Sequence, residues 1–524
     1  MLRRLEKQLV YRPVIKRFVF NPFVLSSFSA ILLCLPFFNG IFWLVSWFGF
    51  IPLFVAIDGK APVKAFLIAY AGGIIFWLAT VYWLAYVTGL GLALMLLYLA
   101  LYQGVFGAAC AYFFSKHRNS AILLVPGFWV ILEYLRSDLL TGFGWALTGY
   151  SQCLNLPIIQ IADITGVWGV SFLILTANVA IYAVCVKRAS AGSERLPVSA
   201  RIKGLSVPIL CLIAAFAYGF YKLNRGPQPL NINSFKVAII QGNIPQELKW
   251  SSGTKDFIIN KYLDITRKAV RDNPDVVVWP EAALPVILEA DPVYYEIVRQ
   301  FCRENSLPLL LGAVTLRGNS YYNSAVLTSR QGILEQRYDK LHLVPFGEYI
   351  PLRKVLPFLD TIVPIGEISF GREYTLFDIA GANKAKSKFG VLICFEDVFP
   401  ELSRNFVRAG AGFLVNITND AWYMHTPASF QHSLCAVFRA VENRVPVARC
   451  ANTGISEFIA PKGKAFNVIR DGRGRNIFID GHKTALLSTG GYGLTFYTRY
   501  GDIFILILAG LLGAVVLRNR RKNV

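Results

Sequence analysis

Three residues in the second half of the chain are of the types needed for an activated thiol nucleophile. Glu281 follows the apolar run VVVWP, Cys394 follows GVLI, and Lys340 lies in RYDKLHLVPFGEYIP (337–351). A thiol is mostly protonated near neutral pH and attacks effectively once a base takes its proton. A carboxylate can be that base, and an ammonium can stabilise the thiolate and the oxyanion of a tetrahedral intermediate. If the fold brings the three side chains together, the thiol could attack a carbonyl carbon.

The residues around them predict an α/β domain over residues 234–498. Apolar runs of strand length end just before polar residues, and stretches with helical period lie between them. Strands that alternate with helices favour an α/β sheet, with reactive groups beyond the carboxyl ends of the strands. The runs 307–315 and 321–329 are close enough to pair as a hairpin. The expected strands are 236–240, 275–279, 307–315, 321–329, 388–398 and 412–420, and the expected helices are 254–272 and 431–443.

The rest of the chain is too apolar for a protein that is soluble throughout. Of its 524 residues, 55% are hydrophobic and 16% charged, and the mean hydropathy is +0.47, whereas soluble proteins carry about 25% charged residues. A helix needs roughly 20 apolar residues to cross a bilayer. We expect about eight spans, at 23–39, 40–57, 63–86, 89–114, 119–136, 163–186, 205–221 and 502–518. Little separates the first two, so a tight hairpin or a re-entrant element is an alternative there.

The basic residues indicate the orientation of these spans. The chain has 53 Lys and Arg against 32 Asp and Glu, a net charge of +21 that would by itself also fit a nucleic-acid-binding protein. The opposite connections near 87–88 and 137–162 contain one charged residue, Asp138. Positive residues stay on the cytoplasmic side, so we expect both termini in the cytoplasm and no nucleic-acid partner. The cations gather before the first span and at 60–64, 116–118, 187–203 and 518–522.

Two charged residues interrupt one expected span. Glu133 and Arg136 lie one helical turn apart near its end. Ionisable residues within a membrane are functional candidates by default. At this spacing the two can also form an ion pair with each other at the membrane interface, which is the alternative.

The motifs around the reactive residues resemble those of a known superfamily. VWPEAALP, YDKLHLVPFGEYIP and GVLICFEDVFPEL are similar, in this order, to the Glu, Lys and Cys boxes of the nitrilase (carbon–nitrogen hydrolase) superfamily. With the spans on both sides, essentially the whole chain resembles the bacterial apolipoprotein N-acyltransferases. Further matching stretches are QGNIPQELKW, NITNDAWY, ANTGIS and TFYTRYGD. The resemblance implies a polytopic α-helical membrane bundle joined to a nitrilase-like αββα sandwich.

The resemblance implies an enzyme of the bacterial inner membrane, and the charge pattern predicts that its catalytic domain lies on the periplasmic side. A monomer is expected, because the site is complete in one chain. The five histidines show no metal-binding spacing, and we expect neither a metal nor another cofactor. The five expected parts are a basic cytoplasmic N-terminus (1–22), a seven-span bundle (23–221), the catalytic domain (234–498), a last span (502–518) and a basic cytoplasmic tail (519–524).

The resemblance also implies a reaction. Glu281 is the general base, Lys340 stabilises the oxyanion and Cys394 attacks an ester carbonyl of a membrane phospholipid. A thioester forms, and the α-amine of the N-terminal diacylglyceryl-cysteine of a lipoprotein then takes the acyl chain. A membrane-tethered nitrilase-type amidase with water as acceptor is the alternative, although it would not need a bundle. A transporter is a third class, but the spans hold few ionisable groups for an ion path.

Five further residues match family positions around the site. Glu348 and Glu396 correspond to supporting glutamates, and Trp250 and Trp422 to tryptophans in mobile loops that bind substrate. Phe395 departs from the pattern, because tyrosine is expected after the nucleophile. A hydroxyl contact is lost there, whereas the ring can still pack and the backbone N–H can still contribute to an oxyanion hole.

Overall fold

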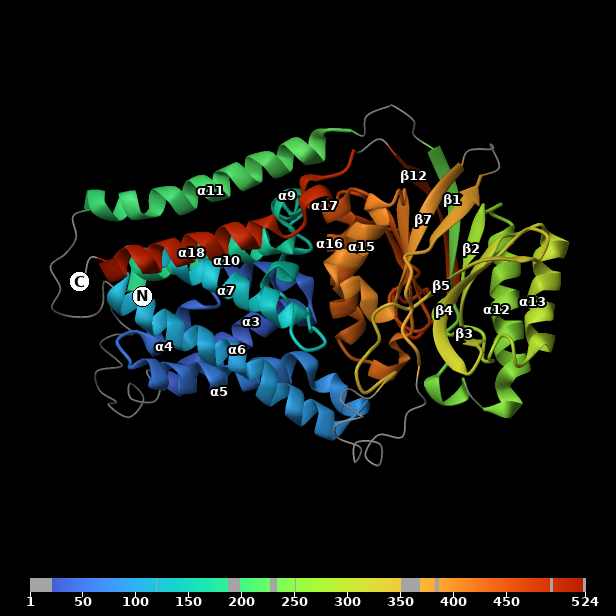
Figure 1. Cartoon of the computed structure of the whole chain (residues 1–524), viewed down its shortest axis with the longest axis horizontal. Helices are drawn as coiled ribbons and strands as arrows, with labels where there is room; N and C mark the ends of the chain where they lie inside the picture. Colours follow the sequence, from blue (N-terminus) through green and yellow to red (C-terminus); the bar gives the residue numbers. More distant parts are fainter. Residues whose placement is uncertain are drawn as a thin grey trace. The chain divides into compact units, whose positions relative to one another are not determined.

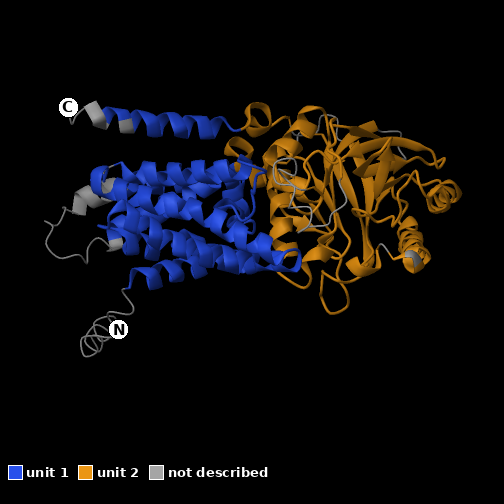
Figure 2. Ribbon diagram, turned by 60° about the horizontal axis from the view of Figure 1, so that its bottom comes forward, with its two compact units in different colours: residues 1–161, 167–221, 502–524 blue, residues 162–166, 222–501 orange. Residues whose placement is uncertain are grey.

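The computed structural model of the chain divides into two compact units (Figures 1 and 2). Unit 1 contains residues 1–161, 167–221 and 502–524, and unit 2 contains residues 162–166 and 222–501. The described part of unit 1 is helical, and the described strands belong to unit 2. The structure describes residues 21–118, 120–186, 198–226, 233–249, 251–349, 368–381, 386–490 and 493–521.

Unit 1 contains helices long and apolar enough to cross a membrane. Five such helices occur among the described residues, at Gly40–Ile57, Pro62–Tyr86, Gly89–Lys116, Val167–Val184 and Leu205–Asn224. Shorter apolar helices lie at Pro22–Phe38, Leu156–Thr165 and Ile503–Val515. The number of about eight crossings stays a prediction. The elements are α3 (Pro22–Phe38), η1 (Gly40–Trp47), α4 (Ile51–Ile57), α5 (Pro62–Val81), η2 (Tyr82–Tyr86), α6 (Gly89–Lys116), α7 (Ala121–Asp138), η3 (Thr148–Gln152), α8 (Leu156–Ile159), α10 (Val167–Ile181), η4 (Tyr182–Val186), α11 (Val198–Asn224) and α18 (Ile503–Arg521).

The expected span 163–186 is broken near its start. The short helix α9 (Ala162–Thr165) ends at Gly166, which adopts a left-handed φ of 64° before α10 begins. Glycine ends helices in this conformation because it has no Cβ to clash. Asp163 on α9 is buried and accepts hydrogen bonds from Arg444 at 2.9 and 3.1 Å. These bonds tie the short helix to unit 2, so one apolar run supplies segments to both units.

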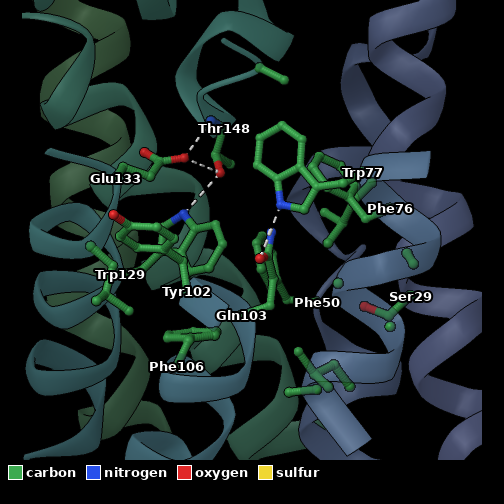
Figure 3. Close-up of a pocket in the computed structure, with 18 of the residues that line it drawn as sticks. Ser29, Phe50, Phe76, Trp77, Tyr102, Gln103, Phe106, Trp129, Glu133 and Thr148 are labelled. Atoms are coloured by element: carbon green, nitrogen blue, oxygen red, sulfur yellow. Dashed lines mark hydrogen bonds between the residues drawn. The ribbon is translucent and has the colours of Figure 1, made fainter. Parts of the chain in front are cut away.

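Glu133 and Arg136 on α7 are both buried, but the expected ion pair between them is not found in the described part of the chain. Glu133 Oε1 instead accepts hydrogen bonds from the N–H and the hydroxyl of Thr148, at 2.6 and 2.8 Å. Arg136 donates to the carbonyl oxygens of Phe143 and Trp145. Both charges therefore hold the loop after α7, and Glu133 and Thr148 lie beside a cavity between the helices (Figure 3).

Unit 2 contains two six-stranded sheets. Their strand orders are β12-β1-β2-β3-β4-β5 and β11-β10-β9-β8-β7-β6. The pairs β1–β2, β2–β3, β7–β8 and β8–β9 are parallel, whereas β3 and β4 form an antiparallel hairpin. The strands are β1 (Asn233–Gln241), β2 (Val276–Val278), β3 (Leu309–Arg317), β4 (Ser320–Thr328), β5 (Leu334–Asp339), β6 (Leu376–Ala380), β7 (Lys386–Ile393), β8 (Phe413–Thr418), β9 (Val447–Ala451), β10 (Glu457–Ile459), β11 (Ala465–Phe466) and β12 (Gly481–Thr489).

The two sheets lie between two layers of helices. Helices α12 and α13 bury Tyr262 and Phe301 against the first sheet, and α15 and α16 pack against the second (Figure 1). The sheets meet each other through Phe235 and Phe413, whose rings stack at 6.4 Å. The layers thus run helix, sheet, sheet, helix, as predicted. The helical elements of unit 2 are η5 (Gln246–Leu248), η6 (Ser252–Thr254), α12 (Lys255–Val270), α13 (Pro292–Asn305), η7 (Cys394–Val398), α15 (Pro400–Arg408), η8 (Asp420–Tyr423), α16 (Ala428–Asn443) and α17 (Phe496–Tyr500).

Candidate active site

The predicted reactive residues all follow carboxyl ends of strands. Glu281 comes three residues after β2, Lys340 directly after β5, and Cys394 directly after β7. Cys394 has a φ of 53°, a left-handed conformation that costs a residue with a side chain about 1–3 kcal/mol. Such strain persists only where surrounding contacts hold it, so the backbone of Cys394 is fixed by its neighbours.

Glu281 and Lys340 meet inside unit 2, together with Glu348. Lys340 Nζ lies 3.5 Å from Glu281 Oε1 and 2.9 Å from Glu348 Oε2, and its side chain is buried. Burial lowers the pKa of Lys340, but Glu348 and then Glu281 outweigh it and raise that pKa above its usual value. Lys340 is therefore a permanent cation, as oxyanion stabilisation requires.

Asn323 is a site residue that the sequence reasoning missed. Its Nδ2 donates to Glu281 Oε1 at 2.7 Å and to Glu348 Oε1 at 2.8 Å. The backbone N–H of Asn419 donates to the other oxygen of Glu281 at 3.0 Å. Glu281 is thus held in one orientation from two sides. Asn323 lies on β4 within a stretch that the sequence marks as a strand, and nothing in its local pattern singles it out.

The Cys394 thiol rests in its protonated form. Burial raises its pKa well above the usual value, and the charge of Glu281 raises it further, whereas Lys340 and the hydroxyl of Thr418 act in the opposite direction. A thiol in this state is a poor nucleophile until a base removes its proton. Glu281, oriented as described and electrostatically coupled to the thiol, is suited to be that base.

Glu396 ties the segment of the nucleophile to the segment of the lysine. Its Oε1 accepts hydrogen bonds from the Tyr338 hydroxyl at 2.9 Å, from Leu341 N at 2.7 Å and from His342 N at 3.1 Å. Its Oε2 accepts from Ile393 N at 2.7 Å. Burial raises the pKa of Glu396 to about 7, although these donors favour the carboxylate. Glu396 therefore supports the site by fixing the residues on either side of it.

A second group of buried charges lies against the backbone of Cys394. The sequence marks Asp420 as a polar residue at the end of an expected strand, but it does not identify the group. We call Asp397, Asp420, His432 and Arg449 the framework cluster. His432 lies 2.9 Å from Asp397 and 3.0 Å from Asp420, and Arg449 lies 2.9 and 3.3 Å from the same two carboxylates. His432 Nε2 also lies 3.2 Å from the carbonyl oxygen of Cys394. The cluster thus supports the strained backbone of Cys394 at its carbonyl oxygen.

Both halves of the chain match known protein families. Residues 29–180 match the model of the apolipoprotein N-acyltransferase N-terminal domain, and residues 236–473 match that of the carbon–nitrogen hydrolases. The chain is 39% identical to an apolipoprotein N-acyltransferase of Geobacter metallireducens over 96% of both chains. The chain belongs to the apolipoprotein N-acyltransferase family. Another member, from Chlorobaculum tepidum, is 28% identical over 97% of this chain and 98% of that relative.

The hydrolase half of this family member has the two-sheet fold of its superfamily. Among solved structures, an amidase from Nesterenkonia sp. aligns with 53% of this chain and 94% of its own, at 16% identity and a TM-score of 0.37.

The predicted aromatic residues of this N-acyltransferase differ in their surroundings. Phe395 is buried and packs edge-on against Phe399 at 5.3 Å, so its ring fills space as predicted. Trp422, on η8, is 50% exposed, an uncommon state for so large an apolar side chain. Its indole ring is therefore accessible at the surface. Trp250 lies outside the described residues.

Proposed function

We propose that this chain transfers an acyl chain from a membrane phospholipid to the α-amine of the N-terminal diacylglyceryl-cysteine of lipoproteins. The buried set of Glu281, Lys340 and Cys394 carries the proposal, in a chain whose relatives are named apolipoprotein N-acyltransferases. Helices long and apolar enough to cross a bilayer support lipid-embedded substrates. An amidase with water as acceptor would need no such helices, and we do not favour it.

The first half-reaction makes a thioester. Glu281 takes the proton of Cys394, and the sulfur attacks the ester carbonyl of the phospholipid. Lys340 and the backbone N–H of Phe395 stabilise the oxyanion, which is charge that develops only in the transition state. The lysophospholipid leaves as an alcohol with the proton that Glu281 held. The second half-reaction passes the acyl group to the amine, and exclusion of water from the site protects the thioester from hydrolysis.

The remaining roles and the topology complete the proposal. Glu348 and Glu396 position Lys340 and Cys394, and Trp250 and Trp422 contact the lipid-like substrates. The catalytic domain, residues 234–498, lies on the periplasmic side of the inner membrane, both termini are cytoplasmic, and the enzyme acts as a monomer. The positive charge in alternate connections supports this orientation.

Intact-mass spectrometry of the purified protein incubated with a defined phospholipid tests the proposal. We expect a mass increase of one acyl chain that hydroxylamine removes, and no increase in Cys394→Ala. Addition of a diacylglyceryl-cysteine peptide should release the adduct as an N-acyl peptide. If the folded, lipid-reconstituted protein forms neither an adduct nor free fatty acid, the acyltransferase proposal is wrong.

A further inference from the structure

Two buried lysines lie next to the catalytic glutamate, and their partners differ. Lys340 is paired with the carboxylates of Glu281 and Glu348. Lys249, at the end of η5, places its Nζ 3.2 Å from the backbone carbonyl oxygen of Glu281, and only 1% of the residue is exposed. Among the described residues, no carboxylate forms an ion pair with Lys249. One amine of the site is thus neutralised by two carboxylates, and the other is bound to a neutral oxygen.

This difference shifts the pKa values of the two amines in opposite directions. Burial lowers the pKa of Lys249 to about 8, although Glu281 after β2, and Cys394 after β7 when it is a thiolate, act to raise it. Near neutral pH, Lys249 can therefore both lose and accept a proton, which Lys340 cannot do. General bases work best when their pKa is near the working pH.

The proposed reaction releases one proton in each turnover. The α-amine of the acceptor has a pKa of about 8 in water, so at neutral pH most of it is the ammonium ion. An ammonium ion has no lone pair with which to attack a thioester. Overall, an ester and an ammonium ion become an amide, an alcohol and one proton. The proton that Cys394 gives to Glu281 in the first half-reaction leaves with the alcohol, so that step is already balanced. A second group is needed to take the extra proton.

We propose that Lys249 is a further catalytic residue, which takes the proton of the acceptor ammonium in the second half-reaction. This inference rests on the proposed function. The neutral Nζ of Lys249 removes one proton, and the free amine attacks the thioester carbonyl and forms the new C–N bond. Glu281 takes a second proton from that nitrogen and gives it to the sulfur of Cys394 as the C–S bond breaks. The cycle ends with a neutral thiol and a carboxylate, and Lys249 passes its proton to solvent.

The experiment separates the two half-reactions and uses two acceptors. The full-length protein is first acylated by phospholipid, and the thioester is then given either a diacylglyceryl-cysteine peptide or hydroxylamine. Hydroxylamine is already unprotonated at neutral pH, so it does not need the base. In Lys249→Met, we expect transfer to the peptide to fall about 10²–10³-fold. Thioester formation and the reaction with hydroxylamine should stay within about threefold of the wild-type rates.

Two further variants control for structural effects. Lys249→Arg keeps a cation but cannot deprotonate near neutral pH, and we expect it to lose peptide transfer as Lys249→Met does. Lys255→Met removes a lysine of α12 that is paired with Asp291 at 2.7 Å, and it should transfer at the wild-type rate.

Several results would overturn the role of Lys249. One is a rate of peptide transfer by Lys249→Met within about threefold of wild type. Others are equal losses of rate with the peptide and with hydroxylamine, or peptide transfer by Lys249→Arg at the wild-type rate. The last is loss of thioester formation in both Lys249 variants. A purely structural lysine would give equal losses or rescue by arginine. The proposed function fails in a different way, because the wild-type protein itself would then form no thioester or pass no acyl group to the peptide.

Discussion

The two clusters of buried charge next to Cys394 differ in how their charges are paired. In the framework cluster, each of the two carboxylates contacts both His432 and Arg449. We call Glu281, Glu348 and Lys340, which we propose belong to the active site, the catalytic cluster. There, Glu281 and Glu348 share the single cation Lys340 at ion-pair distance. The framework cluster is therefore balanced when His432 is protonated, whereas the catalytic cluster has one carboxylate more than it has paired cations.

This difference suits the framework cluster to holding the backbone in place and the catalytic cluster to proton transfer. A balanced set of buried charges resists any change in protonation, because losing one charge leaves another unpaired at a cost of several kcal/mol. Such a set suits a fixed support, and His432 lies against the carbonyl oxygen of the strained Cys394. An unbalanced set can accept or release a proton more easily, as a catalytic site must. Variants in the two clusters should therefore fail in different ways.

The largest effect is expected when the framework cluster loses its arginine. Arg449→Met leaves two fully buried carboxylates to share His432 alone, which should cost about 3–5 kcal/mol of stability. We expect the melting temperature in detergent to fall by roughly 10 °C, with activity lost in proportion to folded protein. Arg473→Met, on an exposed turn, is the control. Unfolding of Arg449→Met at the wild-type temperature would show that the cluster does not support the fold.

The catalytic cluster should show the opposite behaviour. Glu281→Gln removes the base but keeps the shape of the side chain, so we expect acyl transfer to fall about 10²–10⁴-fold. The melting temperature should change by only a few degrees, because either Asn323 or Asn419 can still donate to the amide oxygen, and Glu348 still pairs with Lys340. Intact-mass measurement of thioester formation checks the loss of activity, and thermal unfolding checks the melting temperature. A large loss of stability with activity per folded molecule unchanged would make Glu281 structural.

The sequence predicts the catalytic cluster better than the framework cluster. Apolar runs of strand length identify β1, β2, β3, β4, β7 and β8, and the expected hairpin of β3 and β4 is confirmed. Since reactive groups follow strands, Glu281, Lys340 and Cys394 can be found, although only the motifs select them among many similar residues. His432 and Arg449 carry no local signal, because their partners Asp397 and Asp420 lie elsewhere in the chain.

The differences in the membrane half have a similar origin. Hydropathy predicts one span at 163–186, and a helix of spanning length is found at Val167–Val184. Gly166 separates the start of this run, where the buried Asp163 binds Arg444 within unit 2. Spacing predicts an ion pair between Glu133 and Arg136, but both bind the backbone of the loop after α7. In each case a polar group has a partner outside its own helix, from the next loop to 281 residues away, and the local pattern of one helix does not contain that information.

The smallest effect is expected for His432, and it depends on pH. Burial lowers the pKa of His432, but Asp397 and Asp420 outweigh it and raise that pKa to about 9, against about 6.5 in an unfolded chain. The folded protein then holds the proton more tightly. The stability that His432 contributes is fully present below about pH 6.5 and is lost as the pH rises through about 9.

Thermal unfolding of wild type and His432→Gln between pH 6 and pH 9.5 measures this contribution. Glutamine can still donate to the carbonyl oxygen of Cys394, and Arg449 still contacts both carboxylates, so the variant should fold. Its melting temperature should lie furthest below wild type at pH 6, and the gap should narrow as the pH rises. The comparison isolates His432 from Glu396 and Glu457, whose pKa values burial raises to about 7 in both proteins. A gap that stays constant over this range would mean that His432 is neutral in the folded protein, and the framework cluster would then be unbalanced too.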